Sequence, residues 1–187
     1  MSSPASGNPK AEVRVWDILV RFLHWSLVAG IAIAWLTEDG PGVLHDGAGY
    51  VVLAIVAIRL VWGLAGPRSA RFVRFLRSRP ATLAYARAIL SGAEPRYLGH
   101  NPLGGWMIAA LLLTAAGAGV SGWLYTTDAF WGLSWMEAIH EAFANLLLLL
   151  IAAHIAGVAF TSWRQKENLV RAMVSGRKES RPRDIEP

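Results

Sequence analysis

The chain alternates between four long apolar stretches and shorter polar or basic connections. The apolar stretches cover residues 17–37, 44–65, 104–126 and 139–162. As a helix, each is long enough to cross the hydrocarbon core of a bilayer, which is about 30 Å thick and takes about 20 residues. Lipid offers backbone polar groups no water, so a spanning segment of this kind is expected to be helical. The pattern therefore predicts an all-α protein, a transmembrane four-helix bundle.

Composition supports a membrane protein and removes several kinds of site. Of the 187 residues, 54% are hydrophobic and 17% are charged, whereas soluble domains carry about 25% charged residues. The chain has no cysteine, which excludes disulfides, cysteine-ligated zinc or iron–sulfur centres and covalent attachment of a haem. Residues 1–12 are polar and the first apolar run is as long as a span, so we expect no cleaved signal peptide.

The basic residues are distributed unevenly between the connections. Of the 18 Lys and Arg residues, all except Arg59 lie in the N-terminal segment through Arg21, in the connection 66–103 or after the fourth span, and the connections 38–43 and 127–138 contain none. Positively charged connections stay on the cytoplasmic side. We therefore expect both termini and the basic connection in the cytoplasm. The excess charge then reflects topology and anionic lipid headgroups, and it gives no support to nucleic-acid binding.

The same pattern divides the chain into three parts. Residues 1–13 form a polar N-terminal arm, residues 14–175 form one four-span domain, and residues 176–187 form a basic tail that is expected to be disordered. Within the connection 66–103, an amphipathic piece around Phe72–Leu90 is predicted to lie on the membrane surface.

Four of the five histidines fall in or at the ends of the predicted spans. Ionisable residues at membrane depth are costly, and their usual explanation is a function. His140 and His154 lie on one face of the fourth span, separated by a rise of about 21 Å. Since neighbouring spans run in opposite directions, depth pairs His45 with His140 near the outer surface. His24 is likewise paired with His154 near the inner surface.

Two imidazoles at each of two depths favour two haem groups, each with two axial histidines in a helix bundle. A zinc or nickel ion would require ligands converging at one depth, usually with carboxylates. Isolated structural histidines are the other interpretation, and they leave the matched depths unexplained. Arg59 lies deep in the second span and requires an anion, for which a haem propionate is the natural candidate; the alternative is snorkelling to the inner surface. His100 precedes the third span and is not expected to be an axial ligand.

Small residues are frequent in the spans and have two interpretations. They could allow a flat macrocycle to approach a helix, or they could serve ordinary close helix packing. The glycines concerned are Gly30, Gly47, Gly49, Gly117, Gly119, Gly122 and Gly157.

Several sequence motifs resemble those of a known family. They are V-W-D-I-L-V-R-F-L-H-W at 15–25, L-H-D-G-A-G-Y at 44–50 with I-R-L-V-W-G at 58–63, G-H-N-P-L-G-G-W at 99–106, H-E-A-F-A-N-L at 140–146 and K-E-N-L-V-R-A-M-V-S-G-R-K at 166–178. Together they resemble the prokaryotic cytochrome b561 family, which includes the cytochrome b subunits of nickel–iron hydrogenases. The resemblance implies a multi-pass dihaem cytochrome b of the bacterial inner membrane. In it, His24 and His154 would be the axial ligands of the cytoplasmic-side haem b, and His45 and His140 those of the periplasmic-side haem b.

The resemblance implies an electron-transfer subunit of a respiratory oxidoreductase rather than a stand-alone enzyme. Electrons would pass between a periplasmic redox partner, such as a c-type cytochrome or a hydrogenase-like metalloenzyme, and the quinone pool or another carrier. The outer edge is acidic and has the apolar segment 130–136 beside it, so we expect a partner with a basic patch. The acidic residues of this edge are Glu38, Asp39, Asp46, Asp128, Glu137 and Glu141.

The main alternative is a superoxide:quinone oxidoreductase that acts alone. An anionic substrate prefers a positive funnel, and this outer edge is negative, so the alternative ranks second. A transporter or a structural subunit ranks third, because it does not account for the paired histidines.

Overall fold

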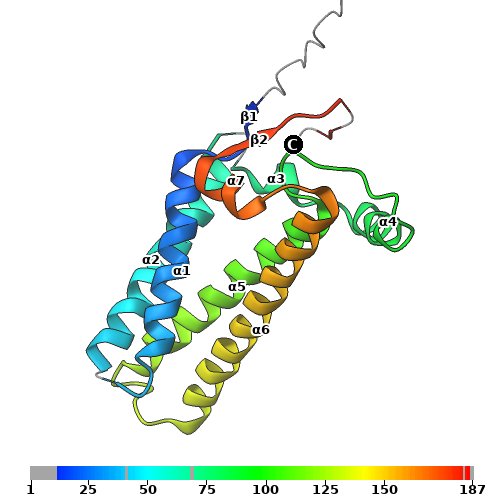
Figure 1. The fold of residues 1–187 in the computed structure, drawn as a ribbon. Coiled ribbons are helices and arrows are strands. Elements are labelled where there is room, and N and C mark those ends of the chain that lie inside the picture. Colours follow the sequence, from blue (N-terminus) through cyan, green and yellow to red (C-terminus); the bar gives the residue numbers. More distant parts are fainter. Residues whose placement is uncertain (1–11, 41, 68–69, 183, 186–187) are drawn as a thin grey trace, which may run out of the picture.

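The computed structural model describes residues 12–40, 42–67, 70–182 and 184–185. Four long helices run side by side along most of the molecule (Figure 1): α1 (Ile18–Leu36), α2 (Gly42–Ala65), α5 (Pro102–Tyr125) and α6 (Ser134–Gln165). All four are long and apolar enough to cross a membrane. The predicted helical fold with four spans is thereby confirmed. The main difference is α6, which begins inside the segment 130–136 that was expected to lie between spans.

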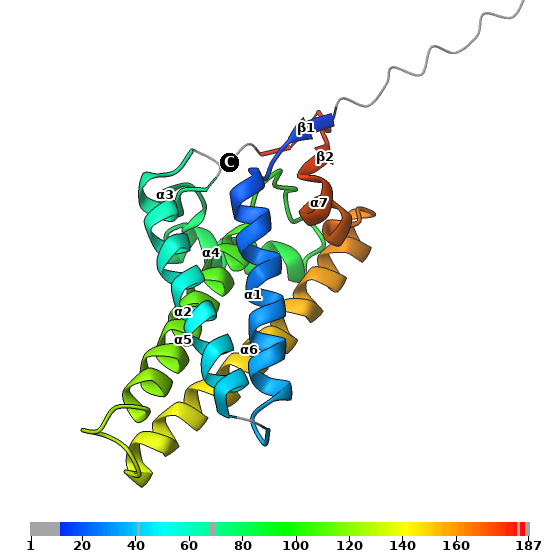
Figure 2. The ribbon, with the colours of Figure 1, turned by 90° about the vertical axis from the view of Figure 1, so that its left-hand side faces the viewer.

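The helices pack in sequence order, α1 on α2, α2 on α5 and α5 on α6 (Figures 1 and 2). Their common core contains Val52 and Val56 of α2, Leu112 and Ala115 of α5 and Leu147 of α6. Most other apolar side chains of the long helices face outward, and α6 buries few of its own. Apolar surface of that extent requires an apolar surrounding, which a bilayer provides.

The glycines separate into two groups according to what a side chain would meet. A Cβ atom would lie 2.8 Å from Val52 at Gly30, 2.5 Å from Phe143 at Gly117 and 3.2 Å from Leu53 at Gly119. These three therefore permit close helix packing, the second of the two interpretations above. In contrast, a Cβ atom would have no neighbour within 4 Å at three other positions, Gly47, Gly49 and Gly157.

Both described ends of the chain lie at the same end of the bundle (Figure 1), here called the terminal end. It consists of the described residues of 12–17, 66–101 and 166–185. The opposite end, the loop end, consists of the described residues of 37–43 and 126–133. At the terminal end, β1 (Glu12–Arg14) pairs antiparallel with β2 (Arg177–Glu179), next to α7 (Leu169–Ser175).

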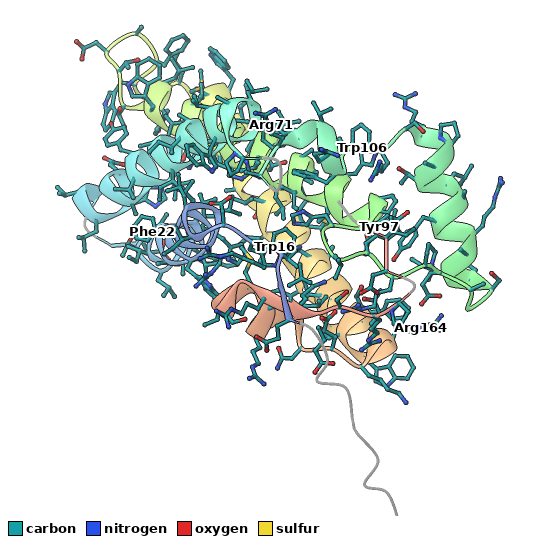
Figure 3. The ribbon with its side chains drawn as sticks, turned by 90° about the horizontal axis from the view of Figure 1, so that it is seen from above. Trp16, Phe22, Arg71, Tyr97, Trp106 and Arg164 are labelled. Carbon is teal, nitrogen blue, oxygen red and sulfur yellow. The ribbon has the colours of Figure 1, made fainter. Side chains whose placement is uncertain are left out.

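The connection between α2 and α5 forms two short helices, α3 (Phe72–Phe75) and α4 (Arg79–Leu90). Viewed onto the terminal end, α4 lies to one side of the bundle and across the direction of the long helices (Figure 3). It buries Tyr85 and exposes Leu83 and Leu90. This is the segment predicted to lie on the membrane surface, and the amphipathic helix itself spans its last 12 residues.

The described residues after Gly176 differ from the prediction of a disordered tail. Lys178 of β2 is only 6% exposed, and its Nζ lies 3.5 Å from Oε2 of Glu167. Arg96 pairs with Asp184 and places its Nη2 2.8 Å from Oε1 of Glu167. The charges that suggested a solvated tail thus have partners elsewhere in the chain, and these pairs hold the tail against the bundle. Most of the predicted polar arm, residues 1–11, lies outside the described residues.

Candidate functional site

His45 and His140 form the first of the two predicted pairs, near the loop end. His45 comes from the first turn of α2 and His140 from α6, and their ring centroids are 6.0 Å apart with the planes at 83°. Nδ1 of His45 lies 2.8 Å from the carbonyl oxygen of Ala34, and Nδ1 of His140 lies 3.0 Å from that of Ala118. A carbonyl oxygen can only accept, so Nδ1 carries the proton in both rings. The Nε2 lone pair of each ring is then free for a ligand.

The distance between the two rings suits two imidazoles that share one metal. With metal–nitrogen bonds of about 2 Å, the two ring centroids of such a pair lie about 6 Å apart. Metal-bound histidines characteristically donate their second nitrogen to a carbonyl or carboxylate, which fixes the tautomer and the ring orientation. Here α1 orients His45 through Ala34, and α5 orients His140 through Ala118. All four long helices therefore contribute to this pair.

Gly122 and Ser121 of α5 lie against the His140 ring. A Cβ atom at Gly122 would be 2.9 Å from Cε1 of His140, so only glycine leaves room for the ring in this position. The Ser121 hydroxyl donates to the Gly117 carbonyl at 2.7 Å and lies 3.4 Å from Nδ1 of His140. Gly122 is thus a positioning residue for the ring, a role that the sequence alone did not separate from helix packing.

His24 of α1 and His154 of α6 form the second predicted pair, toward the terminal end. Both rings are partly buried, and they lie close enough to interact electrostatically. Nδ1 of His24 is buried and has no hydrogen-bond partner among the described residues. The Trp25 ring meets His24 edge-on, with centroids 5.1 Å apart. The structure thus places His24 and His154 within electrostatic range of each other, with a buried nitrogen of His24 left without a partner among the described residues.

His100 lies nearer to this second pair than the sequence suggested. Its ring contacts Trp16 and Phe75, with centroid distances of 4.4 and 4.9 Å. Desolvation, together with the nearby cations Arg59 and Lys178, lowers the pKa of His100 to about 3. His100 is therefore neutral at physiological pH. The one sequence signal that His100 lies near the second pair is its place in the G-H-N-P-L-G-G-W motif.

Arg59 is buried near the terminal end of α2, with only 6% of its surface exposed. Its Nη2 donates to the carbonyl oxygen of Ala70 at 3.2 Å, and its guanidinium lies over the Phe72 ring at 4.9 Å. Its Nη1 is buried and has no hydrogen-bond partner among the described residues. Snorkelling would leave the guanidinium at an exposed surface, whereas here it is enclosed with one donor unused.

The histidines form pairs and not larger clusters. Within the described ranges, no three or more His, Asp or Glu side chains converge on a point where a metal ion could be held. A haem needs only axial ligands from the protein, and each histidine pair offers two imidazoles.

The loop end and the adjoining first turns of α2 and α6 present an acidic surface with exposed aromatic side chains. Trp131 and Trp135 are 69% and 51% exposed. No Lys or Arg occurs between residues 22 and 58 or between 102 and 163. Apart from the partly buried Asp46, the acidic residues predicted for this edge are exposed: Glu38, Asp39, Asp128, Glu137 and Glu141.

A protein-family model described as prokaryotic cytochrome b561 matches residues 15–176, which is most of the chain. Comparisons with curated proteins and with solved structures gave no match. The matched range contains all four paired histidines and Arg59, and it confirms the resemblance noted from the sequence motifs.

Proposed function

The chain belongs to the prokaryotic cytochrome b561 family, and we propose that it is a dihaem electron-transfer subunit of a bacterial respiratory system. Its family and its four apolar helices make it a multi-pass membrane b-type cytochrome of electron transfer. The observation that carries the finer proposal is the loop-end pair. There, the rings of His45 and His140 lie 6.0 Å apart, and both Nδ1 atoms are engaged by carbonyl oxygens, so that the Nε2 lone pairs are left for a ligand.

In this proposal His45 and His140 hold one haem b, and His24 and His154 hold the second. A haem with two axial histidines supplies an iron that accepts and releases one electron without a change of ligands. The protein supplies the lone pairs of the imidazoles, fixes the orientation of the loop-end rings through two carbonyl groups, and keeps water away with apolar helices. The unused Nη1 of Arg59 is the donor for a propionate at the terminal end.

The two pairs lie toward opposite ends of α6, fourteen residues apart in the sequence. By the distribution of positive charge, the terminal end faces the cytoplasm and the loop end faces the periplasm of the inner membrane. Electrons can therefore cross the membrane between a periplasmic donor or acceptor and quinone or another carrier on the inner side.

The acidic loop end is the docking surface for the periplasmic partner in this proposal. A basic patch on a c-type cytochrome or on a hydrogenase-like catalytic subunit complements its charge, and Trp131 and Trp135 provide apolar contact area. Reversing the charge of Asp128 and Glu137 should slow electron entry from the partner. Unchanged partner kinetics at low ionic strength would exclude this docking surface.

The decisive experiment is a dithionite-reduced minus oxidised visible spectrum of the purified protein, with haem quantified as the pyridine haemochrome. About two haem b groups per chain are expected from the two histidine pairs. Absence of haem after expression with an adequate supply would refute the proposal. The same preparation tests the alternative of an enzyme acting alone, because only a superoxide:quinone oxidoreductase would reduce quinone with superoxide and no partner protein.

A further inference from the structure

The surroundings of the loop-end pair are negatively charged. Asp46 directly follows His45, Glu141 directly follows His140, and Glu137 precedes His140 by one helical turn. The stretches 22–58 and 102–163, which contain these residues, have no Lys or Arg to compensate them. The charged side chains that act on a group held between His45 and His140 are therefore carboxylates.

The surroundings of the terminal-end pair are different, because they include buried cations. His100 interacts electrostatically with His24 and His154 and also with the cations Arg59 and Lys178. Arg59 and Lys178 are each 6% exposed. Buried charges act over longer distances than exposed ones, because solvent and salt screen them less.

Anions are also present at the terminal end, but most of them are already paired. Glu167 is shared between Lys178 and Arg96, and Asp184 pairs with Arg96. Asp17 attracts Arg59 from a distance, while one oxygen of Asp17 caps the N-terminus of α1 by accepting from the backbone N–H of Val20. Nη1 of Arg59 has no hydrogen-bond partner among the described residues. The charge of Arg59 is therefore available to neutralise the haem propionate that it would bind at this end, and an unneutralised propionate would destabilise the reduced haem.

Hydrogen bonding to the axial ligands acts in the same direction as these charges. Donation of Nδ1–H to a carbonyl makes an imidazole a stronger base, which favours the oxidised iron. Both loop-end rings make that bond, at 2.8 and 3.0 Å. Nδ1 of His24 makes no such bond within the described part of the chain.

We propose that the haem held by His24 and His154 has the higher reduction potential of the two, and that Arg59 is the main residue that raises it. Reduction adds one electron to the iron, so a nearby cation stabilises the reduced form and a nearby carboxylate destabilises it. The electron then resides preferentially at the terminal end, which favours flow from the loop end toward it. With the terminal end in the cytoplasm, this difference opposes the membrane potential, which resists the inward movement of an electron.

This inference rests on the proposed dihaem function, and it is tested by redox titration of the full-length protein followed through its visible spectrum. The His45→Ala variant should retain only the terminal-end haem. Its single midpoint reduction potential should be the higher of the two that the wild type shows. Arg59→Gln should lower the higher midpoint and leave the lower one in place, while Arg59→Lys should keep most of the wild-type value. Asp46→Asn should raise the lower midpoint alone.

Arg87→Gln is the matched control, because it removes one exposed cation of α4, where solvent screens the charge. It should shift neither midpoint. If Arg59→Gln fails to bind haem, Lys178→Gln removes the other buried cation and should lower the same midpoint. Retention of the lower midpoint in His45→Ala, or equal effects of Arg59→Gln and Arg87→Gln, would overturn the inference. A protein without haem would instead refute the proposed function, so the two failures are distinguishable.

Discussion

The two ends of the bundle each contain a histidine pair, but they are built in different ways. At the loop end, the rings of His45 and His140 are held by carbonyl groups of α1 and α5, so the helices alone orient them. At the terminal end, toward which His24 and His154 lie, β1, β2, α7 and several ion pairs form a cap at the ends of the long helices (Figure 1). The comparison predicts that the loop-end site depends on helix packing, and that the cap can be loosened without disturbing that site.

On the proposal of two haems, the largest expected effect is the loss of one haem from either end. Replacing His140 by Ala should reduce the haem content from about two to about one per chain, because an iron with one axial histidine is weakly held. Replacing His154 by Ala should do the same and leave the other spectral component. Pyridine-haemochrome quantification and redox titration measure both changes. His100→Gln is the control and should retain both haems; loss of both in His140→Ala would contradict two independent sites.

A smaller effect is expected when the His140 ring is displaced but the histidine is kept. Gly122→Ala places a Cβ atom 2.9 Å from Cε1 of His140, so the ring must shift and its bond to the Ala118 carbonyl weakens. Loss of such a supporting bond lowers metal affinity by about 10- to 100-fold. Titration of the purified apoprotein with haem should show this loss for the loop-end component alone. The control is Gly42→Ala, where a Cβ atom meets nothing within 4 Å; equal affinities in the two variants would contradict a positioning role.

Much of this architecture follows from the sequence because membrane-spanning helices obey simple rules. Span length, the distribution of Arg and the depth of each histidine together predicted four helices and paired His45 with His140 and His24 with His154. The rings of His45 and His140 do meet in the structure, at 6.0 Å. The pairing could be predicted because an α-helix converts residue spacing directly into depth.

The supporting contacts could not be predicted in the same way. The carbonyl groups of Ala34 and Ala118 belong to residues without any distinctive side chain, and their availability to a histidine depends on how the helices are rotated. The tail was predicted to be disordered because its composition is polar and basic. Composition does not reveal that Asp184 meets Arg96 and that Lys178 meets Glu167 across large sequence separations.

The cap at the terminal end provides the next test of the comparison. Arg96 bonds to Asp184, to Glu167 and to the carbonyl oxygen of Glu179, and its side chain is only 10% exposed. Arg96→Ala leaves two largely buried carboxylates without this partner and should cost about 3 kcal/mol of stability, the lower end for breaking a buried ion pair. We expect faster proteolysis of the tail, with the loop-end haem spectrum unchanged.

The matched control for Arg96 is Arg177→Ala, which removes an ion pair with Glu12 whose side chains are 66% and 56% exposed. An exposed pair contributes about 0–1 kcal/mol, so the cap should remain protected. Equal proteolysis rates in the two variants would show that the ion pairs of Arg96 do not hold the tail.

The smallest expected effect is a sensitivity to acid that belongs to the terminal end. Burial lowers the pKa of His100 to about 3, whereas the unfolded chain has the ordinary value of 6.5. Between these values the unfolded chain binds a proton that the folded protein excludes. Stability should therefore fall as the pH drops below 6.5, by at most about 1.4 kcal/mol per pH unit. His100→Phe keeps the contacts with Trp16 and Phe75 and removes the titrating group. Its melting temperature should fall less between pH 7 and pH 5 than that of the wild type, and equal falls would place the acid sensitivity elsewhere in the molecule.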